Sequence, residues 1–225
     1  FFFYRGNLTL LEETNNNVAV IGLLNPDGET EEIEREVVAR LVENGATILS
    51  GLAFGCDSIA HKQALNSNAH TVAILPSPLN NILPGKNKEL ANEIVRKSGL
   101  LVTEYLTDAK SKREMGGRYQ ERDRLQALFS NIIFLSASYA KNDLGNDSGS
   151  RLAMGYALGY SIPRAVIYDS KKNSNNPKYD LSRQLIEEDP KIIVIDQNNM
   201  PSIITKLMSI KPKIEKAQPS QQGLL

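Results

Sequence analysis

A series of short, uninterrupted apolar runs constrains the fold of this chain more than any other feature. Most runs show no alternation of apolar and polar residues, which is typical of strands buried on both faces of a parallel sheet. They cover residues 18–22, 46–50, 71–75, 100–104, 132–136, 165–168 and 192–195. The chain is therefore expected to be built around a mostly parallel β-sheet.

Helix-like patterns fill the segments between these runs. Residues 31–42 place Val37 and Leu41 on one face of a helix, and similar patterns occur at 90–95 and 152–160. Alternating strands and helices at this spacing predict an α/β fold with an extended Rossmann-like, doubly wound sheet. The helices would then cover both faces of the sheet.

We predict a single domain over residues 15–209, which is enough chain for a sizeable core. Residues 1–14 would form an N-terminal linker segment. Residues 210–225 would form a disordered tail because they are rich in Lys, Gln, Pro and Ser. Since the chain begins with Phe1 rather than Met, we expect further residues upstream.

Composition narrows the class of protein. Lys plus Arg and Asp plus Glu both number 26, so the formal net charge of zero argues against an indiscriminately basic nucleic-acid binder. A local basic patch remains compatible with this balance. The single cysteine, Cys56, rules out an internal disulfide and fits a cytoplasmic location. No apolar run approaches the ~18 residues that span a membrane, so we expect no membrane association.

The loop after the second apolar run is the first candidate binding site. Ser50, Gly51 and Gly55 lie between a predicted strand and a predicted helix, where unpaired backbone N–H groups gather and can bind phosphate. The alternative is that both glycines only make a tight turn. Asp57 fits an N-cap better than a catalytic acid, and His61 fits a packed residue better than a base, so both are given supporting roles.

A second candidate lies at Ser148, Gly149 and Ser150, where two hydroxyls and a glycine open another predicted helix. Such a start can bind an anion, although ordinary helix capping explains the same residues. Both loops follow the carboxyl end of a predicted strand, and such ends line the ligand crevice of an open α/β sheet. The sequence therefore predicts that the two loops face one crevice.

The third candidate is the basic segment 110–124, which interleaves basic with acidic residues. Gly116 and Gly117 would make its middle flexible, and Tyr119 would be able to stack on a base. Arginines that contact phosphates together with aromatic stacking suit single-stranded nucleic acid. The alternative is a solvated loop held by salt bridges. From this segment we select Arg122 and Arg124 as phosphate ligands near the start of a helix.

No catalytic pattern accompanies these loops. The chain has no HExxH motif, no Cys/His spacing for a metal, no nucleophile elbow and no Walker A ending. We therefore predict a binding protein that is not an enzyme and uses neither a metal nor a cofactor.

These motifs resemble those of the DNA-processing protein A (DprA/Smf) family. Residues 50–61 match most of the family pattern SGLARGIDxxAH, and the resemblance runs in unbroken order from about residue 4 to 168. Further matches are 4–8 to RGNL, 83–87 to YPxEN, 100–105 to LLLSEY, 119–130 to FPxRNRxIAGLS and 148–154 to SGSLITA.

The resemblance implies a Rossmann-like domain that binds single-stranded DNA, presents it to a RecA-type recombinase and forms a homodimer. It also implies a phosphate contact at Gly22, which opens the counterpart of the family's GSR segment. The arginines of GSR and SGLARG are here Leu24 and Phe54, an asparagine of FPxRNR is Asp123, and the acid that ends the VVEA strand is Ser136. Because the loss of the two arginines and the gain of Asp123 weaken the case for DNA, a sensor that binds a free nucleotide in the same crevice remains the alternative.

Overall fold

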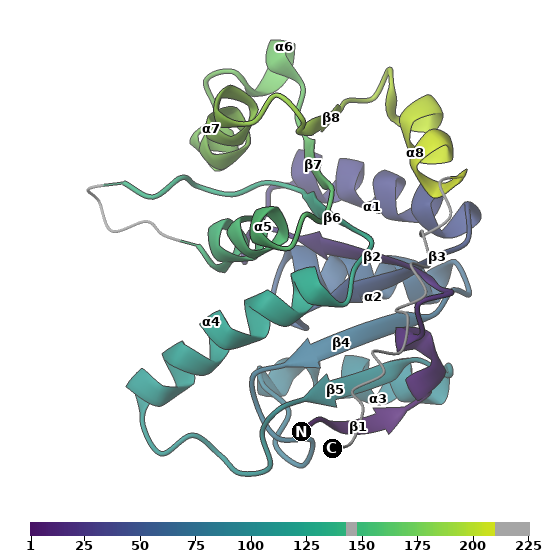
Figure 1. Cartoon of the computed structure of the whole chain (residues 1–225), viewed down its shortest axis with the longest axis vertical. Helices are drawn as coiled ribbons and strands as arrows, with labels where there is room; N and C mark the ends of the chain where they lie inside the picture. Colours follow the sequence, from purple (N-terminus) through teal and green to yellow (C-terminus); the bar gives the residue numbers. More distant parts are fainter. Residues whose placement is uncertain (143–147, 210–225) are drawn as a thin grey trace, which may run out of the picture.

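The computed structural model describes residues 1–142 and 148–209. Within this part of the chain, an eight-stranded sheet lies between two layers of helices (Figure 1). The strand order across the sheet is β1-β5-β4-β3-β2-β6-β7-β8. The strands are β1 (Phe3–Gly6), β2 (Asn16–Ile21), β3 (Ala46–Ser50), β4 (Thr71–Leu75), β5 (Leu100–Thr103), β6 (Ile132–Leu135), β7 (Arg164–Ile167) and β8 (Ile193–Ile195).

All neighbouring strands are parallel except β1, which pairs antiparallel with β5 at the edge of the sheet. The structure thus confirms the predicted mostly parallel, doubly wound sheet. Residues 1–14, predicted as a linker, contain β1 and the 3-10 helix η1 (Leu8–Leu11), so that prediction missed their place at the sheet edge. The predicted tail, 210–225, lies outside the described residues.

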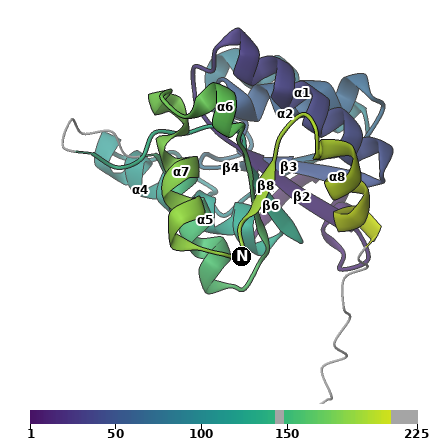
Figure 2. The same cartoon turned by 90° about the horizontal axis from the view of Figure 1, so that it is seen from above.

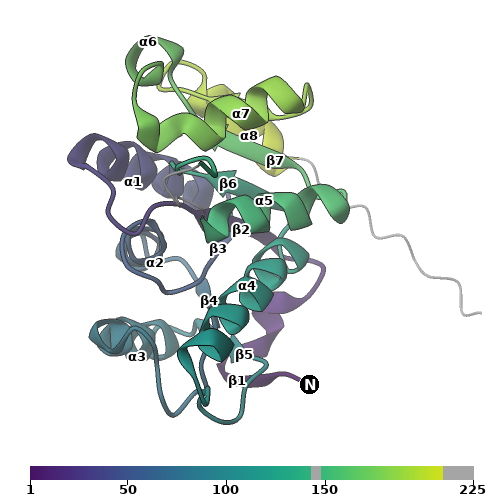
Figure 3. The same ribbon diagram turned by 90° about the vertical axis from the view of Figure 1, so that its left-hand side faces the viewer.

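Helices cover both faces of the sheet, as Figures 2 and 3 show. Apolar residues of α1, α2, α3 and α8 pack on one face, and those of α4, α5 and α7 pack on the other. The helices are α1 (Gly28–Glu43), α2 (Cys56–Asn66), α3 (Lys88–Arg96), α4 (Lys112–Leu128), α5 (Gly149–Gly159), α6 (Ser170–Asn173), α7 (Asp180–Glu188) and α8 (Met200–Ser209), with short 3-10 helices η2 (Gly85–Asn87) and η3 (Pro177–Tyr179).

The basic segment 110–124, whose middle was predicted to be flexible, forms most of α4. Ser111 caps the helix by accepting a hydrogen bond from the Glu114 backbone N–H at 3.1 Å. Glu114 also forms an ion pair with Arg118, one turn later, at 2.7 Å. Capping, this ion pair and the burial of the C-terminal half of α4 offset the low helix propensity of Gly116 and Gly117.

The sheet changes direction at β2, and this positions the site. From β2 the chain proceeds through β3, β4 and β5 on one side, then returns to β6 on the other side. Strands β2 and β6 end level, with Ile21 opposite Leu135. A point where the strand order reverses is the usual ligand crevice of an open α/β sheet.

None of the helices in the described residues is both long enough and apolar enough to cross a membrane.

Candidate nucleic-acid interface

A pocket of about 590 Å³ opens at the carboxyl edge of the sheet, beside the ends of β2, β3 and β6. Both predicted loops reach it, one through Ala53 and Phe54 and the other through residues 148–150. Its lining comprises Ile21, Gly22, Leu23, Leu24, Asn25, Ala53, Phe54, Asp57, Pro84, Tyr119, Arg122, Asp123, Gln126, Ser138, Tyr139, Ser148, Gly149 and Ser150. The predicted site residues Ser50, Gly51, Gly55, Arg124 and His61 do not line it.

The loop between β3 and α2 closes on itself instead of presenting its N–H groups to the pocket. Asp57, the second residue of α2, accepts hydrogen bonds from the backbone N–H groups of Gly51 at 3.1 Å and Ala53 at 3.2 Å. The N-cap position is held by Gly55, so the prediction of Asp57 as the N-cap was wrong. The Asp57 carboxylate therefore already binds donors that the sequence assigned to a phosphate.

Both glycines of this loop are required by their surroundings. Gly55 has φ +68°, and a Cβ there would lie 2.2 Å from the Leu23 carbonyl oxygen. At Gly51 a Cβ would lie only 1.3 Å from Nη1 of Arg122. Close approach by a neighbouring loop and a neighbouring arginine thus explains the two glycines, because neither position leaves room for a side chain.

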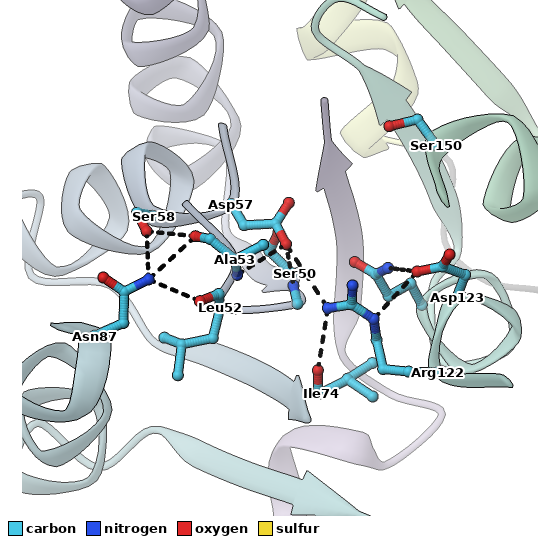
Figure 4. Close-up of polar contacts among 12 residues, drawn as sticks. Ser50, Leu52, Ala53, Asp57, Ser58, Ile74, Asn87, Arg122, Asp123 and Ser150 are labelled. Atoms are coloured by element: carbon cyan, nitrogen blue, oxygen red, sulfur yellow. Dashed lines mark hydrogen bonds and ion pairs between the residues drawn. The ribbon is translucent and has the colours of Figure 1, made fainter. Parts of the chain in front are cut away.

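Asn87, which the sequence reasoning did not select, holds the same loop from the other side. Its Nδ2 donates to the Leu52 carbonyl at 2.8 Å and lies 2.9 Å from the Ser58 hydroxyl (Figure 4). Leu52 is fully buried with φ +60°, a backbone conformation that costs free energy and needs support from its surroundings. The likeness of segment 83–87 to a family motif was the signal that pointed to this residue.

Arg122 is the central charge of the site and lies between two carboxylates (Figure 4). Its Nε donates to Oδ1 of Asp123 at 3.1 Å, and its Nη1 lies 3.7 Å from Oδ2 of Asp57. Its side chain is only 7% exposed. Arg122 thus neutralises buried acids within the protein.

Arg124 does not join Arg122 at the pocket. Its Nη2 contacts both carboxylate oxygens of Glu104 at 2.6 Å. The prediction that both arginines reach the crevice assumed that they lie near a helix start. They lie instead in the second half of α4, where residues two apart point in different directions.

The two pocket carboxyls are harder to ionise than usual. Burial raises the pKa of Asp123 from 3.8 to about 6, against the opposing charge of Arg122. Burial also raises the pKa of Asp57, again opposed by Arg122. Asp123 therefore titrates near pH 6 and is mostly ionised at neutral pH.

The start of α5 forms the opposite wall of the pocket. Ser148 is the N-cap, and its Oγ accepts a hydrogen bond from the Arg151 backbone N–H at 3.3 Å. Ser150 donates to the Gly22 carbonyl at 3.4 Å, which brings Gly22 into the site. A Cβ at Gly149 would lie 2.5 Å from Oδ2 of Asp123, so this carboxylate stands beside the helix N-terminus. An internal anion thus occupies a position that favours negative charge.

Ser50 and His61, two further residues predicted for the site, make contacts inside the protein instead. The Ser50 hydroxyl donates to the Val20 carbonyl at 2.7 Å and ties β3 to β2. His61 is fully buried, with Nδ1 2.7 Å from the Thr71 hydroxyl, and burial lowers its pKa to about 3. His61 is therefore neutral, in agreement with the sequence interpretation as a packed residue.

A third buried carboxyl, that of Glu34 on α1, lies beside Cys56 and Ser136. Burial raises its pKa to about 8, so the group is protonated at neutral pH. Ser136 is the position where the family resemblance leads one to expect an acid. Glu34 brings a carboxyl to that place from a different element, which no sequence pattern indicated.

Among the described residues, no group of three or more His, Cys, Asp or Glu side chains is placed to hold a metal ion.

Comparison with known proteins identifies the family. The family model described as DNA recombination-mediator protein A matches residues 1–203. The chain is 31% identical over 156 residues to Protein Smf of Borreliella burgdorferi, covering 65% of this chain and 47% of that protein. It is 35% identical over 103 residues to the DNA processing protein DprA of Streptococcus pneumoniae, covering 46% and 35%. The chain spans less than half the length of the curated relatives it matches.

Two solved structures share the fold. DNA processing protein A of Helicobacter pylori, described with its single-stranded DNA binding mode, superposes with a TM-score of 0.74 at 27% identity, covering 92% of this chain and 86% of that chain. DprA of S. pneumoniae gives a TM-score of 0.74 at 24% identity, covering 90% of this chain and 65% of that chain. With the family model matching nearly the whole chain, the protein belongs to the DNA recombination-mediator protein A family, the family of the DprA and Smf proteins.

Proposed function

We propose that this chain binds single-stranded DNA at the pocket beside β2 and β6, acting as a binding protein and not as an enzyme. The observation that carries the proposal is the meeting of the β3–α2 loop and the α5 start at one pocket, in a chain of this family. The relative from H. pylori, whose description names single-stranded DNA binding, supports it over most of the chain.

The phosphates would contact Gly22, Ser148, Gly149 and Ser150, where the helix N-terminus offers donors at the pocket wall. Arg122 would support this wall from behind, because it is buried and paired with Asp57 and Asp123. The proposed role of Arg124 requires that it leave Glu104. Ser50, Gly51 and Gly55, with Asp57 and His61 in support, would act by holding the loop in place.

The second candidate is a sensor for a free nucleotide. The volume of the pocket lies within the range of small-molecule sites. Asp57 and Asp123 inside the pocket would also repel the several phosphates of a longer strand. The two functions differ in how strongly salt weakens binding. Each phosphate contact of a single strand adds about 0.7 to the slope of log affinity against log salt concentration, and a lone nucleotide supplies few such contacts.

A charge placed at the α5 start tests the DNA function. Asp and Asn both cap helices well, so Ser148→Asp and Ser148→Asn keep the cap and differ by one negative charge. We expect Ser148→Asp to weaken the binding of a labelled oligonucleotide roughly fivefold or more at low salt, and to reduce the salt slope. Ser148→Asn, whose side-chain amide can still donate to a phosphate, should lose much less affinity than Ser148→Asp.

Fluorescence anisotropy of a labelled oligonucleotide across a salt series measures both the affinity and its salt dependence. If the unmodified chain binds no oligonucleotide at low salt, while a nucleotide raises its melting temperature, the sensor function replaces the DNA function. Equal binding by the two Ser148 variants would remove the α5 start from the interface.

We further propose, from family membership, that the protein acts in the cytoplasm as a homodimer and presents its DNA to a RecA-type recombinase. Light scattering after size exclusion measures whether the chain forms a dimer. Oligonucleotide-dependent ATP hydrolysis by a RecA-type recombinase, with and without this chain, measures whether the chain presents DNA to the recombinase.

A further inference from the structure

A carboxyl group is buried close to the loop that joins β2 to α1. Glu34, in the second turn of α1, is fully buried, and the Cys56 thiol of α2 and the Ser136 hydroxyl just after β6 lie beside it. Within the described part of the chain, neither Glu34 oxygen makes a hydrogen bond of regular geometry, and neither does the Ser136 hydroxyl. A charge placed here would be solvated neither by water nor by donors, so the closed fold requires the neutral acid.

The charges around Glu34 do not offset its burial, which raises its pKa from 4.5 to about 8. Asp57 on α2 is a second acid, and it opposes the ionisation of Glu34 by like-charge repulsion. Arg35, the next residue of α1, favours ionisation, but it is partly exposed and pairs with Glu31 at 2.5 Å. Glu34 therefore keeps its proton at neutral pH while the protein is closed.

The segment that covers Glu34 is only lightly attached to the core. A small apolar cluster separate from the larger core clusters holds it, and this cluster consists of Leu23, Cys56, Ala137 and Tyr179. The fully buried apolar residues of α1 begin only at Val37, after Glu34. The start of α1 is held mainly by polar contacts, from Thr30 to the Tyr179 hydroxyl at 3.0 Å and from Asp27 to Lys178 at 2.9 Å. Regions with few buried apolar contacts open at a lower free-energy cost than the core.

We propose that Glu34 makes residues 22–34 a pH-sensitive switch, which is closed against α2 and β6 while Glu34 holds its proton and opens locally once the proton is lost. Opening brings the carboxyl group into water, where it ionises without penalty. It also breaks the hydrogen bond from the Cys56 backbone N–H to the Leu23 carbonyl, at 2.9 Å in the closed form. Residues 22–25 line the pocket, so opening removes one of its walls. The switch does not depend on which ligand the pocket binds.

Proton linkage fixes the direction and the size of the effect. The pKa of Glu34 is about 8 in the closed form and returns to its ordinary value of 4.5 in the open form, so opening releases a proton between these pH values. The open population should therefore rise by up to about tenfold per pH unit from about pH 5 to about pH 8, and level off above this range.

The thiol of Cys56 reports the opening, because it is the single cysteine of the chain and is fully buried beside Glu34. Mass spectrometry follows its alkylation by N-ethylmaleimide, which reacts with the thiolate. Glu34→Gln keeps the shape of the side chain and cannot ionise. Once the segment is open, the thiolate fraction of Cys56 is the same in both proteins and cancels from the ratio of their labelling rates.

We expect the labelling rate of the unmodified protein, divided by that of Glu34→Gln, to rise by up to about tenfold per pH unit between about pH 5 and 8. Glu32→Gln is the matched control, because Glu32 is an exposed acid of the same helix, and it should follow the unmodified protein. A ratio that does not change with pH would overturn the switch.

Urea separates local opening from global unfolding. Local opening exposes little surface, so urea well below the denaturation midpoint should barely change the labelling rate at pH 8. If labelling instead accelerates with the slope that urea denaturation gives for the whole protein, Cys56 reacts only through global unfolding, and the local switch is wrong.

Discussion

Replacing Asp123 with asparagine tests the charge balance of the pocket. Asp123 is 3% exposed, and its Oδ1 accepts hydrogen bonds from Arg122 and Gln126. An asparagine keeps the shape and can accept the same two bonds through its Oδ1. The substitution therefore removes one negative charge and changes little else.

The pKa of Asp123 sets the expected size and sign of the effect. Burial raises this pKa from 3.8 to about 6, a shift worth about 3 kcal/mol against the ionised form in the folded state. Between these two pH values the folded state binds more protons than the unfolded state. The free energy of unfolding of the unmodified protein must then fall as pH rises through this window.

Asp123→Asn cannot undergo this loss. Its free energy of unfolding should match that of the unmodified protein below about pH 3 and exceed it by about 3 kcal/mol above pH 7. Urea denaturation across this range measures the difference. Asp189→Asn is the control of opposite sign, because Arg164 lowers the pKa of Asp189. A difference between Asp123→Asn and the unmodified protein that stays constant with pH would refute the reasoning.

Three further substitutions probe the surroundings of the site by urea denaturation. Gly51→Val should destabilise the fold by about 3 kcal/mol or more, because its Cβ displaces buried Arg122 from its acids, and unchanged stability would contradict this contact. Asp27 caps α1 by accepting a hydrogen bond from the Thr30 backbone N–H at 2.9 Å. Asp27→Ala removes this cap and should lower the free energy of unfolding by about 1 kcal/mol, whereas Asp27→Asn should retain most of the stability. Burial raises the pKa of Glu34 to about 8, so the unmodified protein should lose stability as pH rises from about 5 to 8. The free energy of unfolding of Glu34→Gln should therefore rise relative to that of the unmodified protein by about 1.4 kcal/mol per pH unit over this range. A difference that stays constant with pH would argue against this.

The core of the fold was predictable because the central strands are buried on both faces. Strands β2 to β8 all begin and end within two residues of the predicted runs. Strand β1 escaped prediction because only Phe3 and Tyr4 of the strand are apolar, Arg5 and Gly6 follow them, and most of Phe3–Gly6 is exposed at the edge of the sheet. The helix over Gly116 and Gly117 was missed for another reason, since tertiary packing of α4 overrides local propensity.

The site was predictable as a place but not as a set of contacts. Strand ends of a parallel sheet meet at one edge, so the two glycine and serine loops had to approach each other. Which carboxylate accepts which N–H depends on distances that no spacing encodes. Asp57 therefore looked like a cap, although it binds its own loop, and Arg124 looked equivalent to Arg122, although Glu104 holds it.

Asp57 and Asp123 lie where the two loops would otherwise offer their N–H groups to an anion, so the proposed DNA binding should depend on pH. Asp57 binds the N–H groups of the β3–α2 loop, and Asp123 stands beside the start of α5. A phosphate that approaches α5 raises the pKa of Asp123 further, because it disfavours the ionised carboxyl. Binding should then take up a proton and tighten as pH falls from about 8 to 6, by at most tenfold per pH unit. Asp123→Asn should bind more tightly near pH 8 and lose this dependence in anisotropy titrations. If the variant and the unmodified chain show the same pH profile, the phosphates do not reach the start of α5.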